Sequence, residues 1–497
     1  MDPLFEIELE RLGKGAREAS ASLYRQLKAA ILDGRLRPGT RLPPVRNAAR
    51  VFGVSRNTAA NLYEKLGSEG YVVTRHGSGT YVANKPPAVA PQATAGMAAA
   101  IDARLNEVWL RPDVTTAMTF WRDSREPPGW TGRSTSVDFR PALIDSQLFP
   151  FDVLRRLVAR QLRGLEKKPA TYKSPQGNQG NYYLRDAIAK HIALTRAVVC
   201  RPDDIVVTSG AQQAFDLLAR VLVKPNETVV GIEDPGYPPM RAAFAAAGAT
   251  VVPVEVDGEG LVLERLPPRV SVICVCPSHQ FPLGVAMSAR RRKALVDFAR
   301  THGAIIVEDD YDGEFRYDGS PLQALRASDP ADVVFYVGTF SKCMLPSLRL
   351  GFIVAPRWAM QALVVAKNCL DWHCPTLIQL AVAEFIVQGH LARHVRKMRH
   401  LYQKRRQALS ATLQRDFRQS LEPIPSFYGM HIAAIARTDL NLERAADALL
   451  DSRVRIHTLA RYYLGTQQKA GLVFGYGTAD VAQIERGLAL LRKVLLD

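Results

Sequence analysis

A lysine at the end of a predicted strand is the first residue whose position suggests chemistry. The apolar segment "DVVFYV" is typical of a buried strand, and "GTFSKCMLPSLRLG" (residues 338–351) follows it directly. This second segment contains Lys342, with Arg349 seven positions later. Lys342 is either a solvated surface charge or a partly desolvated amine, whose lowered pKa would make it a nucleophile.

The ends of other predicted strands carry groups that complement an amine. The strand in "VVTSGAQQAF" leads into a helix whose first amides form an anion site, and "GIEDPGYP", "CPSHQFPLG" and "IIVEDDYDGEF" end three more strands. Because ligands of mostly parallel sheets bind beyond the carboxyl ends of the strands, these groups are expected to meet. An anion cradle, a flat ring, a carboxylate, a phenol, an amine and a guanidinium together suit pyridoxal 5'-phosphate.

Each group has a predicted role toward this cofactor. Lys342 is the predicted catalytic residue and would bind the aldehyde covalently. Asp309 would keep the pyridine nitrogen protonated, which makes the ring an electron sink. Tyr311 would hydrogen-bond the ring hydroxyl, and Tyr237 would stack on the ring face. The residues predicted to bind the phosphate are Ser209, Gly210, Ala211, Thr339 and Arg349.

Each of these features alone also has an ordinary structural interpretation. "SGAQ" could be plain helix capping, and "EDDYD" could be a solvated acidic loop or a cation site. Their order along successive strands favours the cofactor site. His279 or Gln280 would then reach the hydroxyl side of the ring as well. The six cysteines, with His373 beside one of them, do not have the spacing of a metal site, and no metal is expected.

Three short helices and a hairpin are predicted near the N-terminus. "SLYRQLKAAILDG" (22–34), "PPVRNAARVF" (43–52) and "RNTAANLYEKLGSEG" (56–70) carry apolar residues at helical spacing, and "YVVTRHGSGTYV" (71–82) alternates about a glycine turn. This order predicts a winged helix-turn-helix, whose third helix enters the DNA major groove by its first residues. The net charge of +17 agrees with a polyanionic partner, and residues 1–85 alone carry 14 Lys and Arg against 8 Asp and Glu.

This segment closely resembles the DNA-binding domain of the GntR family over "LRPGTRLPPVRNAARVFGVSRNTAANLYEKLGSEGYVVTRHGSGTYV". The resemblance implies that Arg46 contacts the DNA backbone beside the groove. The other residues that it implies at the DNA are Ser55, Arg56, Asn57 and Thr58 at the start of the recognition helix, and His76 and Gly77 at the tip of the wing. The chemistry agrees, since guanidinium groups suit phosphates and guanine edges.

Three regions follow from composition and pattern. Residues 1–83 form the winged helix-turn-helix, an α+β domain, and residues 84–136 are rich in proline, alanine and turn-forming residues, which predicts a linker. Residues 137–497 alternate helices with short apolar strands, which predicts an α/β domain with a smaller α+β lobe from about residue 360. No apolar run reaches about 18 residues, so no membrane span is expected. The N-terminus lacks the order of a signal peptide, and a cytoplasmic location is therefore expected.

The large region resembles the fold-type I aminotransferases, which bind pyridoxal phosphate. The segments that carry the resemblance are "DFRPALIDSQLFPFDVLRR", "EDPGYP", "PSHQFPLG", "EDDYDGEFRY" and "GTFSK" with its following proline and arginine. With the winged helix in front, the whole chain resembles the MocR subfamily of GntR regulators. The resemblance implies a transcription regulator that binds operator DNA as a head-to-tail homodimer. It would sense an amine, an amino acid or pyridoxal phosphate itself at the aminotransferase-like domain.

One departure from the family pattern leaves the effector and the turnover open. Aminotransferases commonly have an arginine within a segment like "RLSF", whereas this chain has "GLVFGYG", with Val473 near that place. Other arginines that would substitute as a carboxylate partner are Arg241, Arg453, Arg455 and Arg461. The main alternative is therefore a working aminotransferase with an appended DNA-binding domain. A third interpretation makes the large domain a dimerisation scaffold without cofactor.

Overall fold

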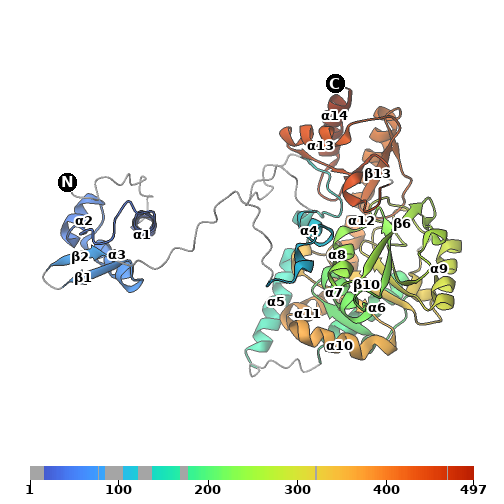
Figure 1. The fold of residues 1–497 in the computed structure, drawn as a ribbon, viewed down its shortest axis with the longest axis horizontal. Helices are drawn as coiled ribbons and strands as arrows, with labels where there is room; N and C mark the ends of the chain where they lie inside the picture. The colour runs from blue at the N-terminus through green and yellow to red at the C-terminus, as the bar shows by residue number, and fades with distance from the viewer. Residues whose placement is uncertain are drawn as a thin grey trace. The chain divides into compact units, whose positions relative to one another are not determined.

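The computed structural model describes residues 16–75, 78–83, 104–120, 137–167, 177–318, 322–466 and 468–496. The chain divides into two compact units, residues 1–102 and 103–497 (Figure 1). Across these described residues, none of the helices combines the length and the apolar character needed to cross a membrane.

The first unit consists of three helices and a two-stranded antiparallel hairpin. Its elements are α1 (Ala16–Leu32), α2 (Val45–Val51), α3 (Arg56–Ser68), β1 (Val72–Arg75) and β2 (Gly79–Val82). Apolar residues at helical spacing meet in one core, which includes Leu23, Leu27, Phe52, Leu62 and Leu66. The predicted winged helix-turn-helix is therefore confirmed. α1 begins six residues earlier than the pattern predicted, because "AREASA" contains mostly good helix formers.

An eight-stranded mixed sheet forms the centre of the second unit. Its order is β4-β11-β10-β9-β8-β5-β6-β7. The strands β10, β9, β8, β5 and β6 run parallel to one another, whereas β11 is antiparallel to β4 and β10, and β7 is antiparallel to β6. The bounds are β4 (Ile205–Thr208), β5 (Val229–Asp234), β6 (Thr250–Asp257), β7 (Gly260–Leu261), β8 (Val270–Val275), β9 (Ile305–Asp310), β10 (Val334–Thr339) and β11 (Gly351–Val354).

Helices cover both faces of this sheet, as the continuous apolar strands predict. Those that pack on one face are α7 (Ala211–Leu222), α8 (Pro238–Ala246) and α10 (Arg357–Asp371). Those that pack on the other face are α5 (Phe151–Leu165), α6 (Tyr182–Arg196), α9 (Ala289–His302) and α11 (Thr376–Val387). The alternation along β10 shows the two layers, since Phe335 and Val337 pack with the first set and Tyr336 with the second.

The C-terminal part of the chain forms a smaller lobe. Its four-stranded antiparallel sheet has the order β12-β13-β16-β15, with bounds β12 (Leu421–Pro423), β13 (His431–Ala436), β15 (His457–Thr458) and β16 (Gly471–Gly475). The helices of the lobe are α12 (His390–Asp416), α13 (Leu442–Asp451) and α14 (Val481–Leu496). A short parallel pair joins β14 (Val454–Arg455) to β3 (Val137–Asp138), so the beginning and the end of the second unit lie together.

One helix from the region predicted as a linker packs onto the large unit. α4 (Pro112–Thr119) lies beside α8 (Figure 1), and Phe120, the residue that follows it, is buried in the main core. Short 3₁₀ helices complete the described structure, namely η2 (Glu107–Leu110), η3 (Ser146–Leu148), η4 (Pro202–Asp204), η5 (Leu263–Arg265), η6 (Leu325–Ser328), η7 (Pro346–Leu348) and η8 (Leu459–Tyr462).

Candidate cofactor site and DNA-binding domain

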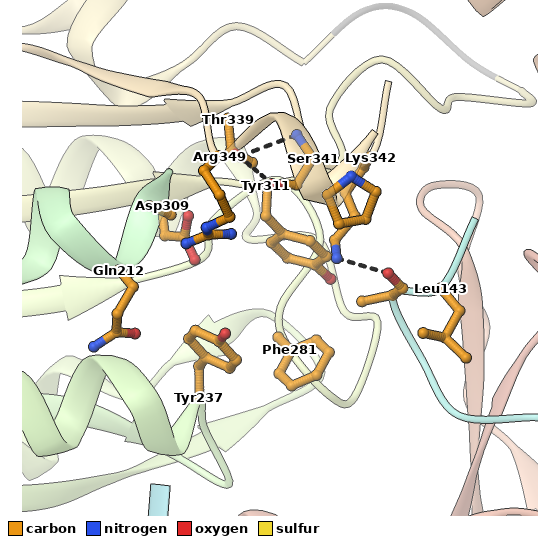
Figure 2. A pocket seen from close by; sticks show the side chains of 13 residues that line it. Leu143, Gln212, Tyr237, Phe281, Asp309, Tyr311, Thr339, Ser341, Lys342 and Arg349 are labelled. Carbon is orange, nitrogen blue, oxygen red and sulfur yellow. Dashed lines mark hydrogen bonds between the residues drawn. The ribbon is translucent and has the colours of Figure 1, made fainter. Parts of the chain in front are cut away.

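A cavity of about 240 Å³ lies at the carboxyl ends of the central strands (Figure 2). Parallel strands place these ends at one edge of the sheet, which is why residues from distant parts of the sequence meet there. The predicted residues that line the cavity are Ala211, Tyr237, Asp309, Tyr311, Thr339, Lys342 and Arg349. Two further predicted residues, Ser209 and Gly210, adjoin it through Arg349.

The amine of Lys342 reaches into the cavity from the loop that follows β10. Its Nζ donates a hydrogen bond to the backbone oxygen of Ala142 at 2.6 Å. Burial lowers the pKa of Lys342 to about 8, although the carboxylates of Asp312 and Asp309 oppose the shift. About a tenth of the amine is therefore neutral at pH 7, far more than for an ordinary lysine. Lys342 is thus not an ordinary solvated surface charge, and its lowered pKa agrees with the predicted role as a nucleophile.

This lowered pKa predicts how cofactor attachment depends on pH. The rate at which pyridoxal phosphate bonds to the protein should rise about tenfold per pH unit below pH 8 and level off above about pH 9. Stopped-flow absorbance of the cofactor-free protein measures this rate. A rate that keeps rising to about pH 10 would mean an ordinary lysine and would contradict the assignment.

The lowered pKa of Lys342 also affects stability. Between its folded pKa of about 8 and its unfolded pKa of 10.5, the unfolded chain binds more protons than the folded one, so this group adds stability as pH rises through that range.

Asp309 carries an acceptor that no described residue satisfies. Its carboxyl group is 4% exposed, and Oδ1 has no hydrogen-bond partner, while the Sγ atom of Cys276 lies 3.7 Å from Oδ2. Burial raises the pKa of Asp309 to about 8, with a contribution from Asp310. Buried polar atoms without a partner are uncommon in folded proteins. A protonated pyridine nitrogen would satisfy this oxygen and stabilise the carboxylate, so the site fits pyridoxal phosphate.

The loop between β4 and α7 adjoins the cavity and suits a phosphate. Gly210 has a φ of +80°, and Arg349 donates from Nη2 to the backbone oxygen of Ser209 at 3.1 Å. The first amides of α7 carry the positive end of the helix dipole. A guanidinium beside these amides can hold a phosphate through paired charge-assisted hydrogen bonds.

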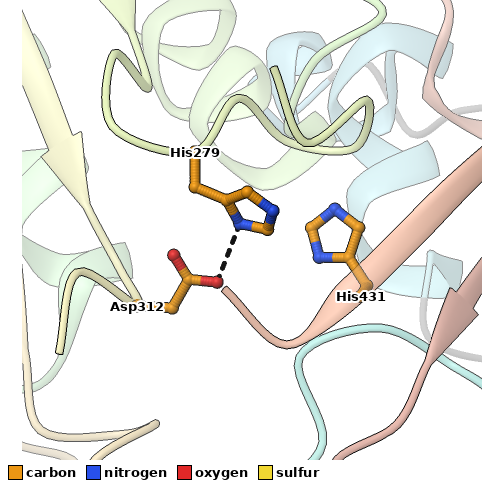
Figure 3. A group of neighbouring side chains, drawn as sticks. All are labelled: His279, Asp312 and His431. Carbon is orange, nitrogen blue, oxygen red and sulfur yellow. Dashed lines mark hydrogen bonds and ion pairs between the residues drawn. The ribbon is translucent and has the colours of Figure 1, made fainter. Parts of the chain in front are cut away.

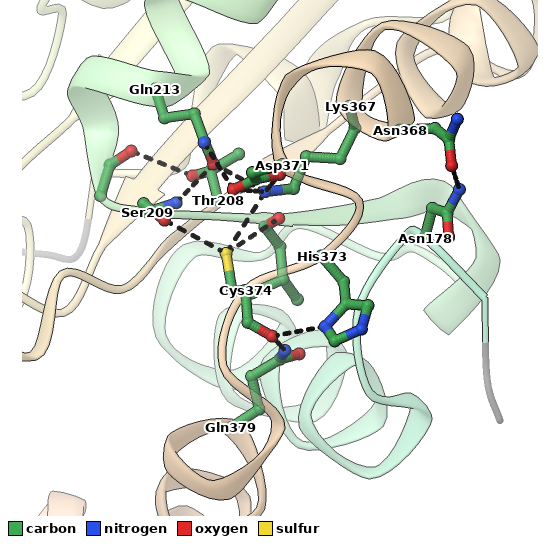
Figure 4. Close-up of polar contacts among 12 residues, drawn as sticks. Asn178, Thr208, Ser209, Gln213, Lys367, Asn368, Asp371, His373, Cys374 and Gln379 are labelled. Atoms are coloured by element: carbon green, nitrogen blue, oxygen red, sulfur yellow. Dashed lines mark hydrogen bonds and ion pairs between the residues drawn. The ribbon is translucent and has the colours of Figure 1, made fainter. Parts of the chain in front are cut away.

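A polar cluster around the buried Lys367 supports this loop (Figure 4). Gln213 accepts a hydrogen bond from the backbone nitrogen of Ser209 at 2.7 Å and another from Lys367 Nζ at 2.8 Å. Lys367 is completely buried and forms an ion pair with Asp371 at 2.6 Å. Because the buried ammonium has an anionic partner and further hydrogen bonds, it fixes the position of Gln213 and through it Ser209.

Gly210→Ala should weaken cofactor binding about tenfold or more, because alanine strains at positive φ by about 1–2 kcal/mol. A Cβ atom at this position would also stand 2.9 Å from Arg349 Nη2 and displace the guanidinium. Absorbance titration with pyridoxal phosphate measures the change. Gly164→Ala is the matched control, since a Cβ there meets nothing within 4 Å. Wild-type affinity in Gly210→Ala would exclude this loop from the phosphate site.

Tyr311 contacts His279, which belongs to a group of buried side chains with Asp312 and His431 (Figure 3). The Nδ1 atom of His279 lies 2.8 Å from the Tyr311 hydroxyl and 3.0 Å from Asp312 Oδ2. Burial lowers the pKa of His279 and of the neighbouring His431 to about 3, so both rings are neutral. In the tautomer that carries its proton on Nδ1, His279 donates to these oxygens and cannot accept from Tyr311, so the Tyr311 hydroxyl can donate its own proton into the cavity. This arrangement supports the predicted bond from Tyr311 to the ring hydroxyl.

Several cavity residues had no predicted role. The ring of Phe281 lies edge-on to Tyr237 at 5.5 Å and to Tyr311 at 5.6 Å, so it narrows the cavity between the two predicted aromatic residues. The sequence predicts that "CPSHQFPLG" ends a strand, but it predicts a role there only for the histidine and the glutamine. The other additional lining residues are Ala142, Leu143, Gln212, Ser341 and Pro346.

His279 and Gln280 lie behind the cavity wall. Gln280 donates from Nε2 to the backbone oxygens of Pro235 and Phe281, at 2.8 and 2.9 Å. The arginines considered as carboxylate partners, Arg241, Arg453, Arg455 and Arg461, are not among the residues that line the cavity. Val473 is fully buried in the adjoining core and carries no charge.

The first unit presents its predicted DNA-binding residues on the surface. Ser55 caps α3, since its hydroxyl accepts a hydrogen bond from the backbone nitrogen of Thr58 at 3.1 Å. Arg46, Arg56 and Asn57 are exposed. This geometry leaves the first turn of the recognition helix available to base edges. The predicted wing residues His76 and Gly77 lie outside the described residues.

Comparison with known protein families agrees with this two-part organisation. Residues 19–82 match the family "Bacterial regulatory proteins, gntR family", and residues 145–473 match "Aminotransferase class I and II". The chain is similar to the probable rhizopine catabolism regulatory protein MocR of Rhizobium meliloti, with 34% identity over 95% of this chain and 93% of that protein. It is also similar to the pyridoxine biosynthesis transcriptional regulator PdxR of Corynebacterium glutamicum, with 31% identity over 92% of each.

Solved structures similar to this chain are aminotransferases. Kynurenine aminotransferase of Pyrococcus horikoshii has a TM-score of 0.67 and 25% identity, over 73% of this chain and 92% of that one. The α-aminoadipate aminotransferase LysN of Thermus thermophilus, complexed with N-(5'-phosphopyridoxyl)-L-leucine, has a TM-score of 0.65 and 28% identity, over 72% and 92%. The chain belongs to the MocR-type regulators of the GntR family, which join a winged helix-turn-helix to a class I and II aminotransferase domain.

Proposed function

We propose that the protein is a DNA-binding transcription regulator that uses pyridoxal 5'-phosphate to sense an amino compound or the cofactor itself. The observation that carries this proposal is the pairing, in one cavity, of a nucleophilic lysine with an unsatisfied buried carboxylate, on a chain that also has an exposed recognition helix. A scaffold that only joined two DNA-binding domains would have no need of either group.

The roles of the cavity residues follow from their chemistry. Bound pyridoxal phosphate supplies an aldehyde that reacts with primary amines and a ring that accepts electrons. Lys342 would hold the aldehyde, and Asp309 would keep the proton on the ring nitrogen. Tyr311 would donate to the ring oxygen and Tyr237 would face the ring. The phosphate would be held by Ser209, Gly210, Ala211, Thr339 and Arg349.

An amine effector would act by taking the place of Lys342 on the cofactor. The displaced amine would have a partner close by, since Lys342 Nζ donates a hydrogen bond to the Ala142 oxygen. Ala142 belongs to the first segment of the second unit that follows the predicted linker, residues 84–136. Release of Lys342 would therefore change its contact with Ala142, in the segment through which the chain continues to the DNA-binding domain. Coupling between the effector site and the DNA site requires a contact of this kind.

We further propose a head-to-tail homodimer that acts in the cytoplasm, where the operator DNA lies. Two recognition helices that read one face of DNA require half-sites separated by about 10 bp or a multiple of it.

DNase footprinting on the DNA upstream of the protein's own gene tests the function. The footprint should change when pyridoxal phosphate is added to the cofactor-free protein, and again when a responsive amine is added. An identical footprint in every condition contradicts the sensing function. Steady-state transamination is measured in parallel, because rapid turnover with an oxo acid would favour the aminotransferase alternative.

A further inference from the structure

Arg241, on α8, is a buried cation that forms no ion pair within the part of the chain that the structure describes. Its side chain is 7% exposed, and Nε is buried without a hydrogen-bond partner. Among the described residues, no hydrogen bond or ion pair involves its guanidinium. Burial lowers the pKa of Arg241, while Asp234 and Asp113 act in the opposite direction from a distance. A buried charge is costly unless it is paired, so the missing partner requires an explanation.

The guanidinium lines a cavity of about 340 Å³, separate from the one that contains Lys342. This second cavity, called here the Arg241 cavity, is also lined by Arg111, Asp113, Asn226 and Thr250. Arg111 and Asp113 neutralise each other through a hydrogen bond of 3.1 Å from Nε to Oδ1.

Asp234, the other acidic group near Arg241, has partners of its own. Its carboxylate accepts hydrogen bonds from the backbone nitrogens of Leu464 and Gly465 at 2.7 and 3.0 Å. Both neighbouring carboxylates thus accept hydrogen bonds from other groups, and among the described residues neither forms a hydrogen bond or an ion pair with the guanidinium of Arg241.

We propose that the Arg241 cavity binds a small oxyanion, a carboxylate or a phosphate group. A planar guanidinium offers two parallel N–H groups that match two oxygens of such an anion. The neighbouring Arg111 adds a second guanidinium, and Asn226 and Thr250 add groups that can donate hydrogen bonds. Such an anion would give the guanidinium of Arg241 the hydrogen-bond acceptor that the described residues do not supply.

The position of this site suggests a regulatory role, which rests on the proposed function. Arg111 directly precedes α4 and Arg241 lies on α8, and these two helices pack side by side (Figure 1). At the far end of α4, the ring of Phe120 lies edge-on to Tyr237 at 6.1 Å. An anion bound by both Arg111 and Arg241 would hold α4 against α8. Because Phe120 follows α4 and contacts Tyr237, the anion would connect the segment that follows the DNA-binding domain with the cofactor cavity.

Equilibrium dialysis of the full-length, cofactor-loaded protein against inorganic phosphate and against acetate tests the site. For phosphate, for acetate or for both, the wild type should bind one more equivalent of anion than Arg241→Gln. Tighter binding of phosphate would identify the ligand as a phosphate group, and tighter binding of acetate would identify it as a carboxylate. Asp113→Asn should bind the anion several-fold more tightly, because a nearby negative charge is removed. Arg265→Gln, in a different cavity, should bind as the wild type does. Equal binding by the wild type and Arg241→Gln, or no binding of either anion, overturns the proposal.

Thermal unfolding in buffer without oxyanions provides an independent test. If Arg241 is unpaired in the free protein, Arg241→Gln should keep or raise the melting temperature, and phosphate should stabilise the wild type alone. A melting temperature lowered in this buffer would mean that Arg241 pairs with an acidic residue of the protein, and would overturn the proposal. Arg241→Lys keeps the positive charge but loses the two parallel N–H groups of the guanidinium, so this variant should bind the anion at least several-fold more weakly. Cofactor attachment at Lys342 and DNA binding in the absence of oxyanions, measured on the same variants, report on the proposed function separately.

Discussion

Lys342→Ala is expected to shift the visible absorbance of the cofactor-bound protein to that of the free aldehyde and to weaken cofactor retention on the order of a hundredfold, about 2.8 kcal/mol. The phosphate cradle and Asp309 remain in this variant, so the cofactor should still bind, but without a covalent bond to the protein. The fold should persist, because the substitution removes a desolvated amine whose hydrogen bond, within the described ranges of the chain, goes to the Ala142 oxygen alone. Absorbance spectra and dialysis of the loaded protein measure both effects.

The same variant should lose the DNA response. Its footprint with pyridoxal phosphate should no longer shift when an amine effector is added, because no protein amine remains to be displaced. Lys190→Ala is the matched control, since Lys190 is a solvated lysine paired with Asp186 on the helix surface. A Lys342→Ala protein that keeps its visible absorbance and its amine response would remove Lys342 from the mechanism.

Arg56→Ala should reduce operator affinity about tenfold or more, since one good contact between a side chain and a base is worth roughly 1–3 kcal/mol. The side chain is exposed in the first turn of α3, where Ser55 caps the helix and keeps that turn in place. Cofactor spectra should not change. Fluorescence anisotropy with operator DNA measures the affinity, and Arg25→Ala on α1 controls for the loss of one positive charge.

The affinity of Arg56→Ala for unrelated DNA should fall much less than its affinity for the operator. Arg46→Ala should show the opposite pattern, a uniform loss on all DNA with a smaller salt dependence, because a backbone contact carries no sequence information. If Arg56→Ala binds the operator as the wild type does, α3 does not read bases through this residue.

The cavity residues predicted from the sequence share one property. Asp309, Tyr311, Thr339 and Lys342 each lie at or just after the end of a parallel strand. A strand pattern is visible in a single segment, and the topology of a parallel sheet then brings the strand ends together. Lys342 and Asp309 could therefore be predicted without knowing how any helix packs.

Other parts of the site depend on packing between distant segments and left no local signal. Ala142 contacts Lys342 from 200 positions away, and the support of Ser209 by Gln213 and Lys367 joins residues about 150 positions apart. Arg241 illustrates the same limit. Arg241 is close to Tyr237 in the sequence and is one of several arginines predicted as partners of an effector carboxylate. In the fold it lines the Arg241 cavity and not the cavity that contains Lys342.

Reduction with borohydride followed by peptide mass spectrometry tests the central claim most directly. The protein loaded with pyridoxal phosphate should carry one reduced cofactor adduct, on the peptide that contains Lys342. An adduct on another lysine, or none, would contradict a covalent cofactor site at the end of β10.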